Sequence, residues 1–299
     1  MKNLTGGDTD VLGERRHLVN LAYRMLGSLA EAEDAVQETY ARWYALTPAR
    51  RAAVAVPGAW LTTVASRVCL DLLGSARVRR ERYVGPWIPE PLPGRADRGG
   101  GTADPADLVT LDESVGMAFL VVLESMTPAE RVAFVLHDVF AYPYADIATI
   151  LTRTPAACRQ LATAARRRLP TAPPPPPATG RAEVVRHFKE AWEAQDIAAL
   201  IALLSPDATL TADGGGLVGT VLRPVSGAEE IARYLLFIAT KSAGTLTLLP
   251  HPVNGVPGLV ARVGGVTATV AALDVDGAGR VSRIWAVRNP EKLGAWQDM

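Results

Sequence analysis

A run of five consecutive prolines, Pro173–Pro177, divides this chain of 299 residues. Proline fixes φ and lacks a backbone N–H, so the run excludes both a helix interior and a central strand and favours an extended polyproline II segment. We therefore expect residues 170–180 to form a stiff linker. Helical patterns precede this linker and strand patterns rich in Val and Gly follow it, which indicates at least two folded parts.

A second break lies between Tyr83 and Asp107, where clustered prolines and a run of glycines exclude long regular elements. We expect a linker over residues 83–111 that joins two helical domains. The domain organisation predicted on this basis is 10–82, 112–169 and 181–299, with two all-α domains followed by an α+β domain.

Composition excludes several classes of protein. Lys plus Arg and Asp plus Glu both number 31, so no bulk charge attracts the chain to nucleic acid or membrane. The two cysteines, Cys69 and Cys158, lie in helical patterns, which excludes a disulfide scaffold and is consistent with a reducing compartment. No apolar leader or membrane-spanning stretch is found, and we expect a cytoplasmic protein without metal or cofactor.

The first helical domain presents an acidic face. Apolar residues recur at helical spacing from Leu18 to Leu29, and a second helix over residues 30–44 places Asp34, Gln37 and Glu38 on its outer side at positions i, i+3 and i+4. Such a face is either solvated or binds a basic partner.

The second helical domain ends in a helix-turn-helix pattern. Thr127 and Glu130 form a capping box, and Thr154 followed by Pro155 starts a last helix that runs to Leu169. From 153 to 169 there are five arginines and no acid. A short turn followed by a basic helix is the geometry that enters a DNA major groove. The side chains expected on its exposed side are Arg159, Gln160, Thr163, Arg166 and Arg167.

These segments resemble regions 2 and 4 of extracytoplasmic function (ECF) sigma factors of the sigma-70 family. The resemblance covers roughly residues 12–169, through RHLVNLAYRMLGSLAEAEDAVQETYARW, WLTTVASRVCLDLLGSARVRRE and MTPAERVAFVLHDVFAYPYADIATILTRTPAACRQLATAARRRL. Three further motifs, WIPEP (Trp87 to Pro91), DGGG (Asp213 to Gly216) and NPEKL (Asn289 to Leu293), resemble those of a subgroup with a SnoaL-like C-terminal extension. The subgroup's glycine motif usually ends in lysine, whereas Leu217 stands there in this chain.

The resemblance implies a promoter-specific subunit of RNA polymerase that is a monomer when free. By this resemblance, Asp34, Gln37 and Glu38 dock on the clamp helices of the β′ subunit of core polymerase, which also contacts the protein through its β subunit. A loop at roughly residues 48–57 and the helix beside it would hold the melted −10 strand. The residues assigned to this strand are Trp60, Thr63, Arg67 and Asp71, with Trp60 equally suited to a core position.

Region 4 would bind the −35 element as duplex. Arg159 and Gln160 can bond guanine and adenine edges, while Arg166 and Arg167 are better placed for phosphates. The alternative is that these arginines merely solubilise a helix end.

The C-terminal domain resembles the cone-shaped α+β fold of SnoaL-like, NTF2-like and ketosteroid isomerase-like proteins, some of which are enzymes. His187, placed in the core or at a pocket rim, His251, placed in a loop between two prolines, and Asp213 are the acid–base candidates. They form no convergent catalytic set in the sequence, so we expect no enzyme but a regulatory module, with a small-molecule ligand still open.

We expect regulation to occur through contact between the C-terminal domain and the WIPEP segment. Trp87 would be its apolar anchor. The residues assigned to the domain's side of this contact are Asp213, Gly214, Gly215, Gly216, Asn289, Pro290, Lys292 and Leu293.

Three alternatives remain open. The chain as a whole would be a ketosteroid isomerase-like enzyme or sensor with an accessory DNA-binding region. An operator-binding repressor is less favoured, because the acidic face of the first helical domain would then have no function. Alternatively, DGGG is only a turn and NPEKL only a C-terminal cap.

Overall fold

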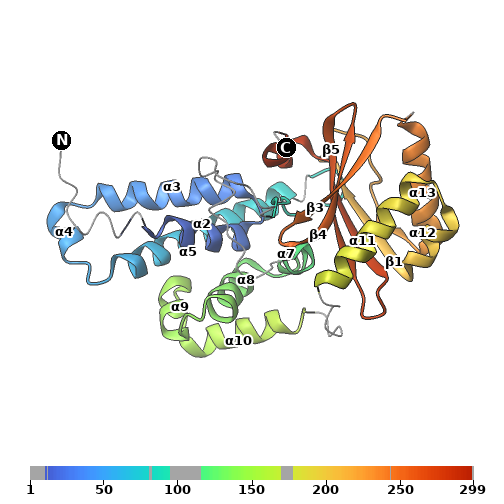
Figure 1. Cartoon of the computed structure of the whole chain (residues 1–299). Coiled ribbons are helices and arrows are strands. Elements are labelled where there is room, and N and C mark those ends of the chain that lie inside the picture. The colour runs from blue at the N-terminus through green and yellow to red at the C-terminus, as the bar shows by residue number, and fades with distance from the viewer. Residues whose placement is uncertain are drawn as a thin grey trace. The chain divides into compact units, whose positions relative to one another are not determined.

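The computed structural model describes residues 11, 13–80, 83–94, 116–169, 178–242 and 244–297 (Figure 1). The chain forms two compact units. The first comprises Met1–Glu81, Thr102–Thr110 and Val122–Pro170, and the second comprises Arg82–Gly101, Leu111–Val121 and Thr171–Met299. The proline run and residues 95–111 of the expected linker lie outside the described residues, so their conformation stays a prediction.

The first unit begins with a helical bundle. Its helices are α2 (Arg15–Leu26), α3 (Leu29–Ala45), α4 (Pro48–Ala52) and α5 (Pro57–Arg80). Gly27 ends α2 in the left-handed region, where glycine carries no steric penalty, and the Ser28 side chain caps α3. The expected loop at 48–57 contains α4, because Thr47 caps a helix whose first residue is Pro48.

The helix-turn-helix follows in the same unit. It consists of α8 (Pro128–Phe134), a π-helical turn (Val135–Val139), α9 (Tyr144–Leu151) and α10 (Pro155–Arg166). The preceding helix α7 (Met117–Glu124) belongs to the second unit up to Val121. The predicted capping box at Thr127 is present, and Thr154 caps α10 as expected. Thr152 adopts a left-handed conformation in the turn between α9 and α10.

The second unit is an α+β domain, as expected. A six-stranded sheet with the order β2-β1-β6-β5-β4-β3 is antiparallel except for the parallel pair β1–β6. The helices α11 (Ala178–Glu193), α12 (Ile197–Leu203) and α13 (Ala228–Lys241) cover one face (Figure 1). The helix α11 begins at Ala178, three residues before the domain start expected at 181. The strands are β1 (Leu204–Asp213), β2 (Val225–Ser226), β3 (Leu246–Val253), β4 (Val256–Val263), β5 (Val266–Val275) and β6 (Val281–Val287).

The opposite face of the sheet carries a second apolar core. Trp285 and other strand residues pack there with Ile88 and Met117, which precede the domain in the chain, and with Leu293 and Trp296 near its end. Two short 3₁₀ helices, η2 (Pro290–Lys292) and η3 (Gly294–Trp296), complete this layer. Residues 83–94 are therefore part of the second unit's fold rather than a free connection.

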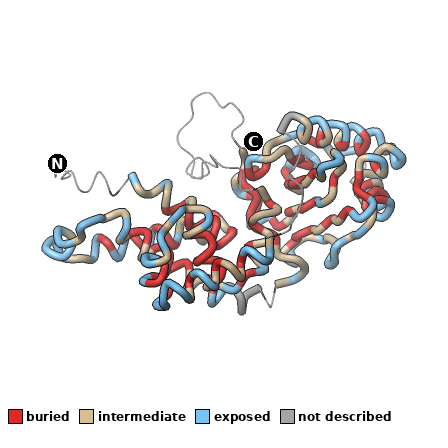
Figure 2. Tube along the Cα trace, turned by 90° about the horizontal axis from the view of Figure 1, so that it is seen from below, coloured by how far each residue is buried: buried red, intermediate tan, exposed pale blue. Residues whose placement is uncertain are grey.

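Burial follows these cores in both units (Figure 2). None of the described helices combines the length and the apolar character that a membrane crossing demands. Among the described side chains, no cluster of His, Cys, Asp and Glu has the composition of a metal site.

Candidate functional site

The most elaborate polar cluster of the second unit lies where residues 83–94 meet the end of the sheet. Asp213 comes from the end of β1, Asn289 follows β6, and Lys292 ends η2. We call the set formed by Asp213, Asn289, Lys292 and residues 83–94 the linker latch. It unites residues from the WIPEP, DGGG and NPEKL motifs.

Asp213 is the centre of the latch and is fully buried. Its Oδ1 accepts hydrogen bonds from the Tyr83 hydroxyl at 2.6 Å and from the Gly215 N–H at 3.0 Å. Its Oδ2 accepts from the Ile88 N–H at 2.9 Å and from Lys292 Nζ at 2.7 Å. Four donors match the roughly four acceptor sites of a carboxylate, which is the condition for burying it without a large cost.

Lys292 joins the domain directly to the linker. Its Nζ donates to the Ile88 carbonyl at 2.6 Å as well as to Asp213, and only 9% of the residue is exposed. The ammonium also lies 4.0 Å from the centre of the Trp87 ring and 5.1 Å from that of Tyr83. A desolvated cation against two aromatic rings adds a cation–π attraction to the ion pair.

Tyr83 closes the cluster on its other side. The Asn289 Nδ2 donates to the Tyr83 hydroxyl at 2.9 Å, while that hydroxyl donates to Asp213. Burial, together with this hydrogen bond to Asp213, raises the pKa of the Tyr83 hydroxyl above its usual value. The hydroxyl therefore keeps the proton that the latch uses.

The glycines of DGGG allow the backbone to approach closely. Gly215 has φ +62°, and a Cβ there would lie 2.5 Å from Nδ2 of Asn289. Gly216 has φ +75°, and its Cβ would lie 3.0 Å from that of Val84. Side chains at these positions would both strain the turn and displace the linker.

The far end of the linker is held by a side-chain hydrogen bond and by backbone pairing. Trp296 Nε1 donates to the Pro91 carbonyl at 2.8 Å, and the Asn254 N–H donates to the Leu92 carbonyl at 2.8 Å. Pro93 forms an antiparallel bridge with Val253. The linker thus extends the β3–β4 hairpin by one short strand-like pairing.

The structure corrects one residue of the expected contact and places the others. Ile88, 1% exposed, is the buried apolar anchor, while Trp87 is half-buried and contacts Lys292. Leu293 is buried in the second core, and Pro290 opens η2. Leu217, which stands in place of the lysine that usually ends the glycine motif, is 58% exposed and lies on the surface.

Sequence reasoning missed one member of the latch and two residues that hold the far end of the linker. Tyr83, Asn254 and Trp296 carried no local pattern that pointed to the linker. Asn254-Gly255 is, however, a typical two-residue hairpin turn, and both residues have positive φ. That signal predicts the β3–β4 hairpin, although not its contact with Leu92.

The acid–base candidates of the second unit do not come together as a catalytic set. His187 is exposed on α11 beside Arg186, in contrast to the expected core or rim position. His251 lies within β3, not in a loop, and its ring packs edge-on against Trp296. Asp213 is fully occupied by the latch.

In the first unit, the acidic face of α3 is open. Asp34, Gln37 and Glu38 are all exposed, and Glu38 pairs with Arg42 on the same helix at 2.8 Å. Inward-facing Ala35 and Thr39 are buried between them. The face is therefore available to a partner with basic groups.

The expected −10 residues lie along α5. Trp60 is half-buried and packs on Trp43 with ring centres 5.1 Å apart, so its ring is in part a core element. Thr63 donates to the Ala59 carbonyl, and Asp71 is exposed. Arg67 is exposed, and one of its terminal nitrogens donates to the Thr149 carbonyl at 2.8 Å.

The expected −35 residues lie on the outer side of α10, and all are at least partly exposed. Arg159 lies over the Tyr144 ring at 5.3 Å. Arg166 pairs with Asp138 at 2.6 Å, and this bond raises the pKa of its guanidinium. The remaining residues of this set are Gln160, Thr163 and Arg167.

The two halves of the first unit contact each other. The Tyr142 hydroxyl is 3.1 Å from both His17 Nε2 on α2 and the Thr62 hydroxyl on α5. Arg131 on α8 donates to the Met25 carbonyl at 2.9 Å and pairs with Glu124. Burial lowers the pKa of Arg131 to about 10, which leaves it charged at neutral pH.

Comparison with known proteins decides the family. Residues 11–79 match the model of sigma-70 region 2, and residues 116–169 match that of sigma-70 region 4. The ECF RNA polymerase sigma factor SigJ of Mycobacterium tuberculosis is 38% identical over 292 residues, covering 93% of this chain and 90% of SigJ. The chain belongs to the ECF RNA polymerase sigma factors.

Two further comparisons extend over the C-terminal domain. The probable ECF RNA polymerase sigma factor SigI of the same species is 37% identical over 285 residues, covering 93% of this chain and 92% of SigI. The crystal structure of SigJ of Mycobacterium tuberculosis is similar to the structure of the present chain, with a TM-score of 0.76 and 36% sequence identity. The match covers 96% of the present chain and 98% of SigJ. The predicted region 2, region 4 and C-terminal α+β extension are thereby confirmed, and the reading of the whole chain as an isomerase-like enzyme is not favoured.

Proposed function

We propose that the C-terminal domain regulates this ECF sigma factor by holding, through the linker latch, the segment that connects regions 2 and 4. The observation that carries the proposal is the burial of Asp213 and Lys292 on the backbone of Ile88. Two buried charges that form hydrogen bonds with the backbone of a connecting segment favour one conformation of that segment over its extended alternatives. We infer a binding role for this domain, without catalysis.

A closed latch shortens the connection between the two promoter-reading regions. Residues 83–94 are twelve residues, which span about 40 Å when fully extended. While the latch holds residues 83–94, this length cannot contribute to the connection between regions 2 and 4. We infer that the closed latch restrains the separation of the two regions and that its release raises promoter output.

Contacts within the first unit support the same direction. Arg67, which we assign to the −10 strand, donates to a carbonyl of α9 in region 4. Tyr142 of region 4 contacts Thr62 beside the same surface of α5. Binding of a −10 strand at Arg67 therefore competes with the contact between the regions, and a longer free connection makes their separation easier.

The partner surfaces follow from exposure and charge. We propose that Asp34, Gln37 and Glu38 bind the β′ clamp helices of core polymerase, with the β subunit as a second partner, and that Trp60, Thr63, Arg67 and Asp71 contact the −10 strand. We assign Arg159, Gln160 and Thr163 to base edges of the −35 element and Arg166 and Arg167 to its phosphates. In this proposal the protein acts in the cytoplasm as a monomer until it binds polymerase.

Transcription with purified core polymerase tests the regulatory proposal. Leu293→Asp places a charge in the second core, and truncation before Asn289 removes the lysine that bonds Ile88. Both should raise output from a cognate promoter several-fold at equal protein concentration, while binding of isolated −35 duplex is unchanged. Output equal to that of the unaltered chain from both variants would remove the case for an in-chain regulator.

A further inference from the structure

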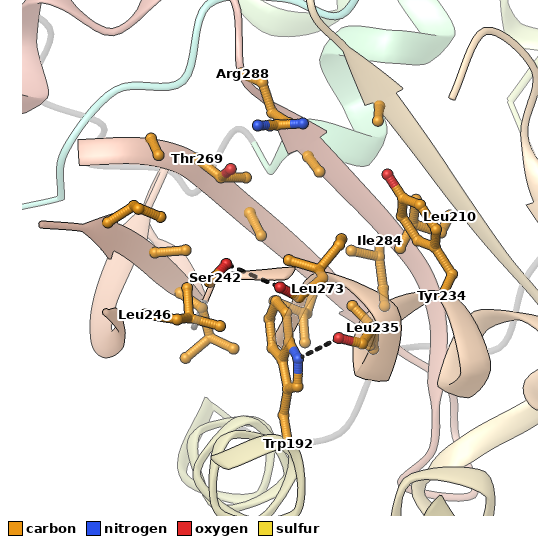
Figure 3. A pocket seen from close by; sticks show the side chains of 18 of the residues that line it. Trp192, Leu210, Tyr234, Leu235, Ser242, Leu246, Thr269, Leu273, Ile284 and Arg288 are labelled. Carbon is orange, nitrogen blue, oxygen red and sulfur yellow. Dashed lines mark hydrogen bonds between the residues drawn. The ribbon is translucent and has the colours of Figure 1, made fainter. Parts of the chain in front are cut away.

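A cavity of about 90 Å³ lies between the sheet and the helices α11 and α13. Its walls are largely apolar side chains of these helices and of β1, β4, β5 and β6, among them Leu210, Ala261, Leu273 and Ile284. Figure 3 shows Trp192 rising from α11 at one side of the cavity and Arg288 at the opposite side. The cavity is thus an apolar chamber with a cation at one end.

Two polar groups of the wall are already bonded within the protein. Trp192 Nε1 donates to the Leu235 carbonyl at 2.9 Å, and the Ser242 hydroxyl donates to the Ile238 carbonyl at 2.8 Å. Figure 3 shows both bonds at the apolar side, whereas Thr269 lies on the side of Arg288. The remaining polar side chains of the wall are Arg288, Thr269 and Tyr234.

The Arg288 guanidinium has N–H groups available for a ligand. One terminal nitrogen donates to the Gly219 carbonyl, and the other side-chain N–H groups have no acceptor among the described residues. The residues that line the cavity include no Asp or Glu. A guanidinium has five donors in a planar fork, which fits a carboxylate with two parallel bonds.

We propose that this cavity binds a small carboxylic acid whose ring or short aliphatic chain fills the apolar chamber and whose carboxylate bonds Arg288. The chamber is smaller than the roughly 150 Å³ cavity that accommodates benzene in an engineered protein, so the apolar part is at most one ring or a short chain. Thr269 supplies a further hydroxyl donor beside the carboxylate.

The cavity and the linker latch share neighbouring residues on two strands. Side chains alternate along a strand, so Ala212 on β1 faces the cavity while Asp213 faces the latch. Just beyond β6, Arg288 lines the cavity while Asn289 belongs to the latch. The backbone N–H of Arg288 also donates to the backbone carbonyl of Asp213 at 2.7 Å.

The Arg288 side chain reaches the latch by a second route. It donates a hydrogen bond to the Gly219 carbonyl, in the loop that begins with the DGGG glycines. Gly216 of the same loop lies close to Val84 of the linker. A carboxylate that fixes the guanidinium would stabilise this loop against the linker. Occupancy therefore closes the latch; this coupling rests on the function proposed for the latch, whereas binding itself does not.

The experiment measures both parts on the full chain. Benzoate and straight-chain carboxylates from butanoate to octanoate are titrated by calorimetry, with benzyl alcohol and the matching alcohols as uncharged counterparts. Hydrogen exchange of residues 83–94 is then compared with and without the tightest binder. We expect at least one carboxylate to bind, its alcohol to bind about tenfold to hundredfold more weakly, and exchange in 83–94 to slow.

Two variants and one control separate the outcomes. Arg288→Gln should remove the preference for the acid, and Ala286→Leu, which fills the cavity from β6, should remove binding of both acid and alcohol. Arg233→Gln, on the exposed side of α13, should bind as the unaltered chain does. No binding by any acid, or equal binding of acid and alcohol, overturns the site. Binding that leaves exchange in 83–94 unchanged overturns the coupling, even if the latch variants alter transcription.

Discussion

Replacing Lys292 with methionine tests how strongly the linker latch is held. Methionine keeps most of the side-chain volume and removes the charge, so Asp213 is left buried without its cation and the Ile88 carbonyl without its donor. Removal of one partner of a buried, hydrogen-bonded ion pair costs about 3–5 kcal/mol. The exposed pair of Arg233 with Glu230 is the matched control, and Arg233→Met should cost less than about 1 kcal/mol.

The assay is urea unfolding of the full chain followed by tryptophan fluorescence. Four of the six tryptophans, at positions 87, 192, 285 and 296, belong to the second unit, so the signal reports chiefly on that unit. The double variant Asp213→Asn with Lys292→Met should recover part of the loss, because it no longer buries an unpaired charge. Equal losses for Lys292→Met and Arg233→Met, with no recovery in the double variant, would refute this reading of the latch.

Three further predictions concern the first unit. Asp34→Lys with Glu38→Lys should abolish capture of core polymerase without changing the helical circular dichroism, since both side chains are exposed; undiminished capture would contradict the proposed face. Arg159→Ala should relax base preference in the −35 element, whereas Arg167→Ala should weaken binding to all sequences and reduce its salt slope by about one, as measured by fluorescence anisotropy; identical behaviour of the two variants would show that the helix register is wrong. Burial raises the pKa of Cys69 to about 12, so its thiol should resist iodoacetamide at pH 8 in the folded chain and react in urea; rapid native labelling on peptide mapping would contradict the burial.

The helices of the first unit were predictable because their signals are local. Caps at Thr127 and Thr154 and the apolar spacing from Leu18 define these helices without reference to distant residues. The short helix α4 escaped prediction, since five residues carry too little periodicity. Its cap, Thr47 followed by Pro48, was nevertheless present in the sequence.

The latch was predictable only in part because it depends on pairing across more than a hundred residues. Charge and glycine content drew attention to Asp213 and Lys292 as contact residues. That Ile88 rather than Trp87 fills the core depends on the sheet face it meets, which is composed of strand residues near the end of the chain. His251 was assigned to a loop because prolines flank it, yet β3 lies at the edge of the sheet, where prolines are tolerated.

Locking the latch shows whether release of the linker sets promoter output. Pro93 and Val253 face each other as an antiparallel pair flanked by the bonds from the Gly94 N–H to Pro252 and from the Asn254 N–H to Leu92. Such non-hydrogen-bonded pairs bring side chains close enough for a disulfide between cysteines placed at 93 and 253. The native cysteines are buried and free.

The measurement is transcription by reconstituted polymerase with the Pro93→Cys, Val253→Cys chain, oxidised and then reduced. The oxidised form should give several-fold lower output than the reduced form, because a linker tied to the C-terminal domain cannot lengthen the connection between regions 2 and 4. The unaltered chain should give the same output under both conditions. Equal output from the locked and reduced forms, with the disulfide verified by mass spectrometry, would contradict regulation by release of the linker.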